Sequence, residues 1–67
     1  MGANPFRARV PEPLPDPVTD AARCIEIAPI VLAAELWDLY ADLPNKAEAT
    51  LAQRRLEEAV YWGGRAA

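Results

Sequence analysis

A three-residue break, Leu43-Pro44-Asn45, separates two helical segments in this chain. Proline disfavours the α conformation in the residue before it, so Leu43 should end the first helix. Asn45 can cap a following helix, and Glu48 three residues later gives a close relative of the capping box. The sequence therefore predicts an antiparallel two-helix hairpin, with a first helix over about 19–42, a turn over 43–45 and a second helix over about 46–63.

The first helix carries two apolar stripes, because residues spaced three and four apart share one side of a helix. Thr19 or Asp20 is expected to cap this helix. Pro29 removes one backbone hydrogen bond, which predicts either a kink or a split near Ile25. The first stripe comprises Ile25, Pro29, Leu32, Leu36, Leu39 and Leu43, and the second comprises Ile30, Ala33, Trp37 and Tyr40.

The second helix has an inner stripe made mainly of small residues, which let two helix backbones approach closely. Leu51, Val60 and Trp62 lie outside this stripe, and Gly63-Gly64 should end or fray the helix. The stripe comprises Ala49, Ala52, Leu56, Ala59 and Gly63.

A chain of 67 residues with one cysteine and no histidine has few ways to stabilise itself. A domain of about 60 residues buries only about 60 % of its unfolded surface. One cysteine excludes an intrachain disulfide, and a zinc site normally needs Cys and His ligands. The two helices also carry more apolar surface than they can cover in each other, so we expect a symmetric homo-oligomer and no stable lone monomer.

The first 18 residues form a separate segment that holds five of the seven prolines. Such spacing excludes a helix interior and favours an extended polyproline-II arm. Two alternatives remain open: a disordered tail, or an ordered arm that lies on a neighbouring subunit with Phe6 and Leu14 as anchors. The division is thus an arm over 1–18 and a helical hairpin over 19–67.

Composition and charge exclude several function classes. A net charge of −3 argues against binding long nucleic acid. The longest apolar run, residues 27–34, is too short to span a membrane, and the N-terminus lacks a signal core, so we expect a cytoplasmic protein. Histidine, the commonest general base, is missing, and no pair of Asp or Glu residues is marked by its spacing as a catalytic pair. We therefore expect no enzyme, no cofactor and no metal.

Basic residues and aromatic rings supply the candidate ligand contacts. Phosphates need cationic groups and bases need flat rings. The competing interpretations are surface ion pairs for Arg54 and Arg55 with Glu57 and Glu58, and a packing role for Phe6 and the other rings. The candidate ligand-binding residues are Phe6, Arg7 and Arg9 in the arm, Lys46 at the start of the second helix, and Arg54 and Arg55 within it.

Two stretches resemble a known family. Pro44-Asn45-Lys46 followed by LAQRRLEEAVYW over 51–62 resembles the second helix of the helical-hairpin family of phage anti-CBASS and anti-Thoeris proteins, whose members read approximately P-S-R-E-K and L-A-x-T-K-L-E-E-A-x-x-W-A. Asn4-Pro5-Phe6 with the prolines that follow is similar to the N-x-F…P-P arm of that family.

The resemblance implies a non-enzymatic sponge that sequesters cyclic nucleotide signals in the cytoplasm of an infected bacterium. The ligands implied are cyclic di- and trinucleotides or cyclic ADP-ribose isomers, and the assembly implied is a homo-oligomer such as a hexamer. Phe6 matches the arm aromatic, Lys46 stands in place of an arginine, and Arg55 matches the lysine before L-E-E-A. Arg54 replaces a threonine. The alternative function is an oligomeric structural or adaptor module that binds no nucleotide.

Overall fold

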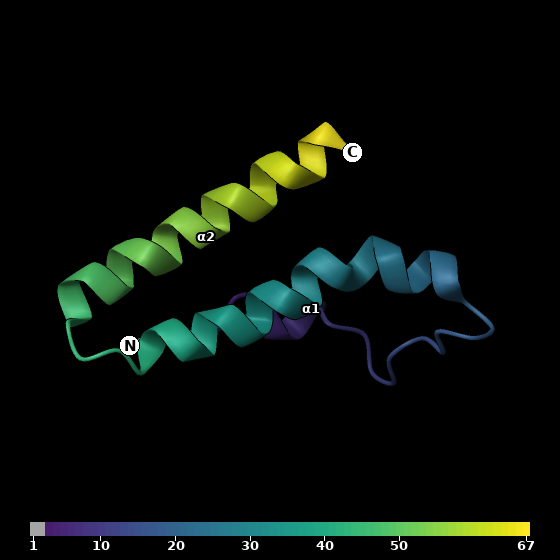
Figure 1. Cartoon of the computed structure of the whole chain (residues 1–67), viewed down its shortest axis with the longest axis horizontal. Coiled ribbons are helices and arrows are strands. Elements are labelled where there is room, and N and C mark those ends of the chain that lie inside the picture. Colours follow the sequence, from purple (N-terminus) through teal and green to yellow (C-terminus); the bar gives the residue numbers. More distant parts are fainter. Residues whose placement is uncertain (1–2) are drawn as a thin grey trace.

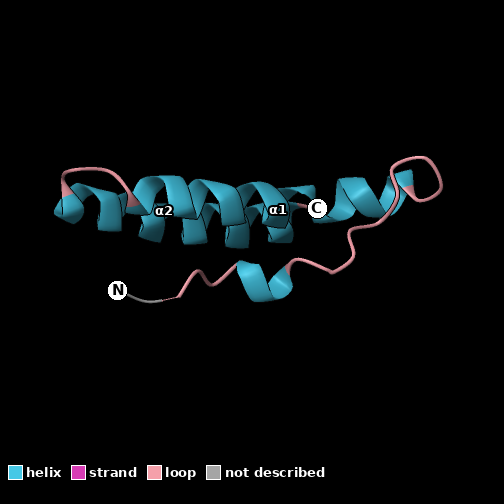
Figure 2. Ribbon diagram, turned by 90° about the horizontal axis from the view of Figure 1, so that it is seen from below, coloured by secondary structure: helices cyan, strands magenta, loops and turns pink. Residues whose placement is uncertain are grey.

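The computed structural model describes residues 3–67 as a hairpin of two antiparallel helices with an N-terminal arm packed on one side (Figure 1). A one-turn 3-10 helix, η1, spans Arg7–Arg9, and the long helices are α1 (Ala21–Ala41) and α2 (Lys46–Ala66). The arm crosses one face of the layer formed by the two helices (Figure 2). The predicted all-α hairpin is confirmed; residues 1 and 2 of the expected arm lie outside the described residues.

The turn forms as its local chemistry predicts. The Asn45 side-chain oxygen accepts a hydrogen bond from the Glu48 backbone N–H at 3.1 Å. The Asn45 amide group donates to the Glu48 carboxylate, also at 3.1 Å. The N-cap half of the capping box is therefore made, Glu48 is held by the Asn45 side chain rather than by its backbone N–H, and α2 begins at Lys46.

Helix α1 differs from expectation at its start. It begins at Ala21 with Asp20 at the cap position, but the Asp20 side chain makes no capping hydrogen bond. Asp16 orders the approach instead: its carboxylate accepts from the Val18 N–H and its carbonyl from the Asp20 N–H, both at 2.8 Å. The helix does not split at Pro29, because the proline removes only one hydrogen bond of an otherwise continuous helix.

Helix α2 also continues beyond its expected end at Gly63. It passes through Gly63 and Gly64 and ends at Ala66. Two glycines cost about 1 kcal/mol each relative to alanine, which is a small penalty when the preceding turns are already formed.

The core lies between α1, α2 and the arm, and it uses the second apolar stripe of α1 (Ile30, Ala33 and Trp37) together with Ala34. The first stripe is mainly exposed, which agrees with our expectation that the two helices carry more apolar surface than they can cover in each other. Val60, which we placed outside the inner stripe of α2, packs against this core. The buried residues are Phe6, Ala33, Ala34, Ala49 and Gln53, and the partly buried apolar residues packed against Phe6, Ala33 and Ala34 are Val10, Ile30, Trp37, Leu56 and Val60.

The arm is not extended throughout and it packs on its own hairpin. Between Pro5 and Pro11 the backbone N–H groups are free to donate, and they close the turn of η1: the Arg9 N–H reaches the Phe6 carbonyl at 3.0 Å and the Val10 N–H reaches the Arg7 carbonyl at 3.2 Å. The disordered-tail interpretation therefore does not describe residues 3–10. Within the described part of the chain, neither helix is long and apolar enough to cross a lipid bilayer.

Candidate functional site

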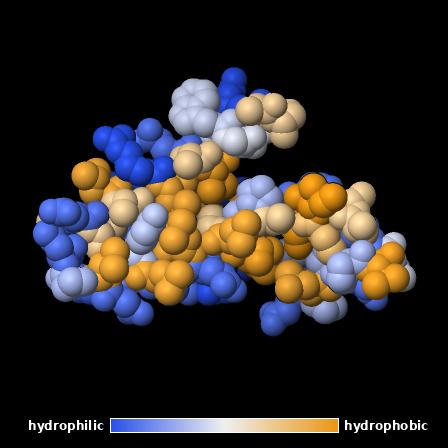
Figure 3. All heavy atoms as spheres, viewed as in Figure 1, coloured by the Kyte–Doolittle hydropathy of each residue, from blue (hydrophilic) through white to orange (hydrophobic). Residues whose placement is uncertain are grey.

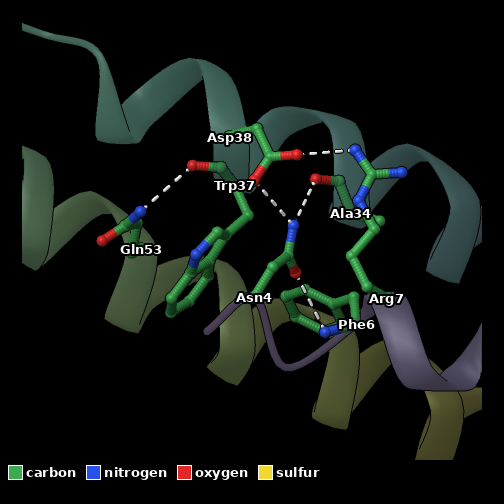
Figure 4. Close-up of polar contacts among 7 residues, drawn as sticks. All are labelled: Asn4, Phe6, Arg7, Ala34, Trp37, Asp38 and Gln53. Atoms are coloured by element: carbon green, nitrogen blue, oxygen red, sulfur yellow. Dashed lines mark hydrogen bonds and ion pairs between the residues drawn. The ribbon is translucent and has the colours of Figure 1, made fainter. Parts of the chain in front are cut away.

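Two polar side chains of the arm converge on Asp38 of α1 (Figure 4). The Arg7 guanidinium donates to one Asp38 oxygen at 2.6 Å, and the Asn4 amide donates to the other at 3.0 Å. The same Asn4 nitrogen also donates to the Ala34 carbonyl at 2.7 Å, while its oxygen accepts from the Phe6 backbone N–H at 3.0 Å. One carboxylate and one amide therefore fix the path of the arm over α1.

The Asp38 carboxylate is stabilised in its charged form. The hydrogen bond from Arg7, followed by that from Asn4, lowers the pKa of Asp38 below its ordinary value. Both side chains of the Arg7–Asp38 pair are about half exposed, so salt screens their attraction. The main contribution of the pair is to hold the arm in position over α1.

Phe6 is the anchor of the arm. Its side chain is buried against Ala33 and Ala34, and its ring meets the Trp37 indole edge-on at 6.0 Å between centroids. The Arg9 guanidinium lies 6.0 Å from the centroid of the same ring. A ring placed in this way has the packing role that we weighed for Phe6, and its faces are not open to a base while the arm is docked.

Gln53 joins the two helices on the inner side of α2. It is 5 % exposed, and its amide group donates to the Trp37 carbonyl at 3.0 Å. This bond links α2 to α1 at Trp37, the residue whose ring contacts Phe6 (Figure 4).

The remaining candidate cations have different surroundings. Arg55 pairs with Glu58 at 3.1 Å, as the helical spacing predicts. The Lys46 ammonium donates to the Ala41 carbonyl at 2.7 Å, so it caps the C-terminal end of α1 rather than standing free at the start of α2. Arg9 also lines a hollow of about 400 Å³ between the diverging ends of the helices, together with Pro29 of α1 and Gly63 and Gly64 of α2.

Arg54 differs from the other basic residues. Among residues 3–67 it makes no ion pair, so the competing interpretation of a surface pair with Glu57 or Glu58 does not describe Arg54. Its side chain borders an open groove of about 420 Å³ on the same side as the arm. The groove is lined by Ala3 and Pro5 of the arm, Trp37 of α1, and Thr50, Gln53, Arg54 and Glu57 of α2.

A single chain therefore does not bring the six candidate residues together. Phe6, Arg7 and Arg9 follow one another along the arm. Arg54 borders the groove, whereas Arg55 is absent from its lining and Lys46 lies at the turn. A ligand that contacts several of these groups needs either a movement of the arm or a second copy of the chain.

Sequence reasoning missed three polar contacts of this region: Asn4 and Asp38, which attach the arm, and Gln53, which joins the two helices. Gln53 lies four residues after Ala49 and therefore beside the inner stripe, where a polar residue signals a buried hydrogen bond. Asn4 and Asp38 are 34 positions apart, so no local pattern pairs them. As for metals, no cluster of three or more His, Cys, Asp or Glu ligands occurs within residues 3–67.

Comparison with known proteins supports the resemblance noted in the sequence. A family model described as Acb2/Tad1, hairpin domain, matches residues 7–67, which include η1 and both helices. No curated protein and no solved structure matches the chain.

Proposed function

We propose that this chain, which belongs to the Acb2/Tad1 hairpin-domain family, is a phage anti-defence sponge that binds cyclic nucleotide immune signals without cleaving them. The family match over residues 7–67 is the observation that carries this proposal. The candidate signals are cyclic di- and trinucleotides and cyclic ADP-ribose isomers. Such a protein acts by stoichiometry, because an effector releases its signal once the free concentration falls below its dissociation constant.

The groove beside Arg54 supports this proposal on the single chain. Within residues 3–67 the Arg54 guanidinium has no ion-pair partner, so its planar set of donors can bind a phosphate. A volume of about 420 Å³ falls within the range of small-molecule sites. Arg54 is therefore our first candidate for a phosphate contact, with Thr50 beside it as a hydroxyl donor.

The arm residues have a different role in this proposal. Phe6 is buried, so stacking on a base requires the arm to leave the core. While the arm is docked, Phe6 positions Arg7 and Arg9, and Arg9 remains exposed over the ring. Lys46 and Arg55 lie apart from the groove, and we propose that they contact ligand across a boundary between subunits.

Assembly into a homo-oligomer is part of the proposal. Its support is the scatter of the cations over one chain, which leaves each single-chain site incomplete. Assembly would bring cations of different subunits together around one ligand, and a hexamer is the arrangement implied by the family resemblance.

Isothermal titration calorimetry with a panel of cyclic di- and trinucleotides and cyclic ADP-ribose isomers tests the sponge. We expect saturable heat for at least one ligand at tens of micromolar protein. Arg54→Ala should weaken that binding, whereas Arg23→Ala is the matched control, because Arg23 is an exposed arginine of α1 paired with Glu26. Absence of heat with every ligand would overturn the proposal.

An oligomeric structural or adaptor module is the second candidate. The observation in its favour is that Phe6 is buried and Arg7 is paired with Asp38, so both side chains already have a structural role in the docked arm. Arg54→Ala and Lys46→Ala separate the two functions. Lost ligand binding with intact assembly supports the sponge, and lost assembly supports the structural role.

A further inference from the structure

The groove beside Arg54 holds a second charged group that the proposed phosphate contact does not use. Glu57 lies three residues after Arg54 on α2, and both residues line the groove. This spacing favours an ion pair on a helix. Within residues 3–67, however, Glu57 makes no ion pair and no side-chain hydrogen bond. The groove therefore presents a cationic donor and an anionic acceptor, both of them available to a ligand.

The polar residues of the groove form a row along α2. Thr50, Arg54 and Glu57 lie on one side of the helix, since residues three and four apart share a side. The helical rise separates Thr50 from Glu57 by about 10 Å along the axis, which is comparable to the length of a nucleotide from its phosphate to the far edge of its base. Trp37 of α1 lines the same groove. One end of the row can therefore hold a phosphate while the other reaches the base.

The opposite face of the layer has a different character. Figure 3 shows a band of apolar residues along α1 on the face viewed there, with hydrophilic residues gathered along the outer edge of α2. Polar recognition of a ligand thus depends mainly on side chains of α2.

A carboxylate beside a phosphate site weakens binding unless the ligand donates hydrogen bonds to it. An ionised phosphodiester has only acceptors, so the donors must come from the base. Guanine carries two adjacent donors on its Watson–Crick edge, the N1–H and the N2 amino group, and one carboxylate can accept both. Adenine presents one donor there, its N6 amino group, beside the N1 lone pair, which repels the second carboxylate oxygen. Cytosine likewise places an acceptor next to its amino group.

We propose that Glu57 makes this groove selective for guanine. Arg54 and Thr50 contact the phosphate, the Glu57 carboxylate accepts from N1–H and the N2 amino group, and the base packs against Trp37. This inference rests on the proposed function and narrows its ligand class to cyclic oligonucleotides that contain guanine. Arg54 contributes affinity for every cyclic nucleotide, whereas Glu57 determines which base enters.

Three cyclic dinucleotides with the same ring and phosphates but different bases test the selectivity by calorimetry: cyclic di-GMP, cyclic di-IMP and cyclic di-AMP. Hypoxanthine, the base of cyclic di-IMP, keeps N1–H and lacks the N2 amino group. The affinity of the wild-type protein should therefore fall from cyclic di-GMP to cyclic di-IMP and again to cyclic di-AMP. The first and last should differ by about 10- to 100-fold, as for a bidentate contact to a base edge.

Glu57→Gln changes the acceptor without changing its size. The glutamine amide group would face a donor of guanine, so the affinity for cyclic di-GMP should fall at least about 10-fold. The affinity for cyclic di-AMP should rise, because an amide can accept from N6 and donate to N1 of adenine. Glu58→Gln is the matched control, since Glu58 pairs with Arg55 and does not line the groove. It should leave the order of the three ligands unchanged, and circular dichroism checks that both variants are folded.

The outcomes separate this inference from the proposed function. Equal affinities for cyclic di-GMP and cyclic di-AMP, an unchanged order in Glu57→Gln, or binding confined to ligands without guanine would overturn the inference and leave the sponge intact. Absence of heat with every cyclic nucleotide of the wider panel would overturn both.

Discussion

The Phe6 ring meets the Trp37 indole at an interplanar angle of 74°, with 6.0 Å between the ring centroids. Edge-to-face contact of this kind is favourable beyond the area it buries. Phe6 belongs to the arm and Trp37 to α1, so this aromatic pair links two segments that are far apart in sequence. The contact therefore anchors the arm on α1.

Phe6→Ala should release the arm from the hairpin. Loss of a buried phenylalanine costs about 3 kcal/mol, which is large against the contacts that hold so short a segment. Limited trypsin digestion measures the release, because Arg7 and Arg9 become better substrates once η1 opens. Val18→Ala is the control, since Val18 is 88 % exposed and its loss should leave cleavage unchanged. Slow cleavage of Phe6→Ala would contradict the anchoring role.

Gln53→Ala should lower the free energy of unfolding by about 1 kcal/mol, because it removes the hydrogen bond to the Trp37 carbonyl. Gln53→Glu should be more damaging at neutral pH, since an ionised carboxylate cannot donate and is buried at this position. Chemical denaturation followed by circular dichroism measures both. Thr50→Ala, at an exposed position on the same helix, should have little effect. Equal stability of the two Gln53 variants would argue against the bond.

The Asp38 attachment predicts a dependence of stability on pH. The folded chain lowers the pKa of Asp38, so its contribution is fully present above the unfolded pKa of about 3.9 and is lost as the pH falls through the lower folded value. Asp38→Asn should therefore reduce the melting temperature at neutral pH, and this difference from wild type should shrink in strong acid. A difference that stays constant into strong acid would exclude the ionised carboxylate as its source.

Gly64→Ala should stabilise the chain. Gly64 is helical, and a Cβ added there meets nothing within 4 Å. Alanine is favoured over glycine in a helix interior by about 1 kcal/mol. Thermal unfolding of the variant at matched protein concentration measures the gain. A loss of stability would indicate that another subunit closely approaches this glycine.

The hairpin could be predicted because its determinants are local. Asn45, Glu48 and Pro44 act within a few residues of one another, and together they specify where one helix ends and the next begins. The end of α2 was placed too early, since Gly63 and Gly64 are weak helix breakers when the preceding turns are formed.

The choice between the two stripes of α1 could not be made from periodicity. Both stripes have helical spacing, and the side of α1 that turns inward is the one that packs against Phe6 of the arm and against Leu56 and Val60 of α2. The arm attachment through Asn4 and Asp38 depends on the same tertiary arrangement. Among the candidate cations, Arg7 pairs with Asp38, which lies 31 residues away, and Lys46 reaches across the turn to the Ala41 carbonyl; no local sequence motif reveals either contact.

The most direct test of the account is the fate of a bound nucleotide. The protein is incubated with each candidate cyclic nucleotide, freed of unbound ligand and denatured by heat, and the released small molecules are quantified by mass spectrometry. We expect one ligand class to be recovered intact and in stoichiometric proportion to the protein. Recovery of a cleaved nucleotide, or retention of none, would contradict a sponge.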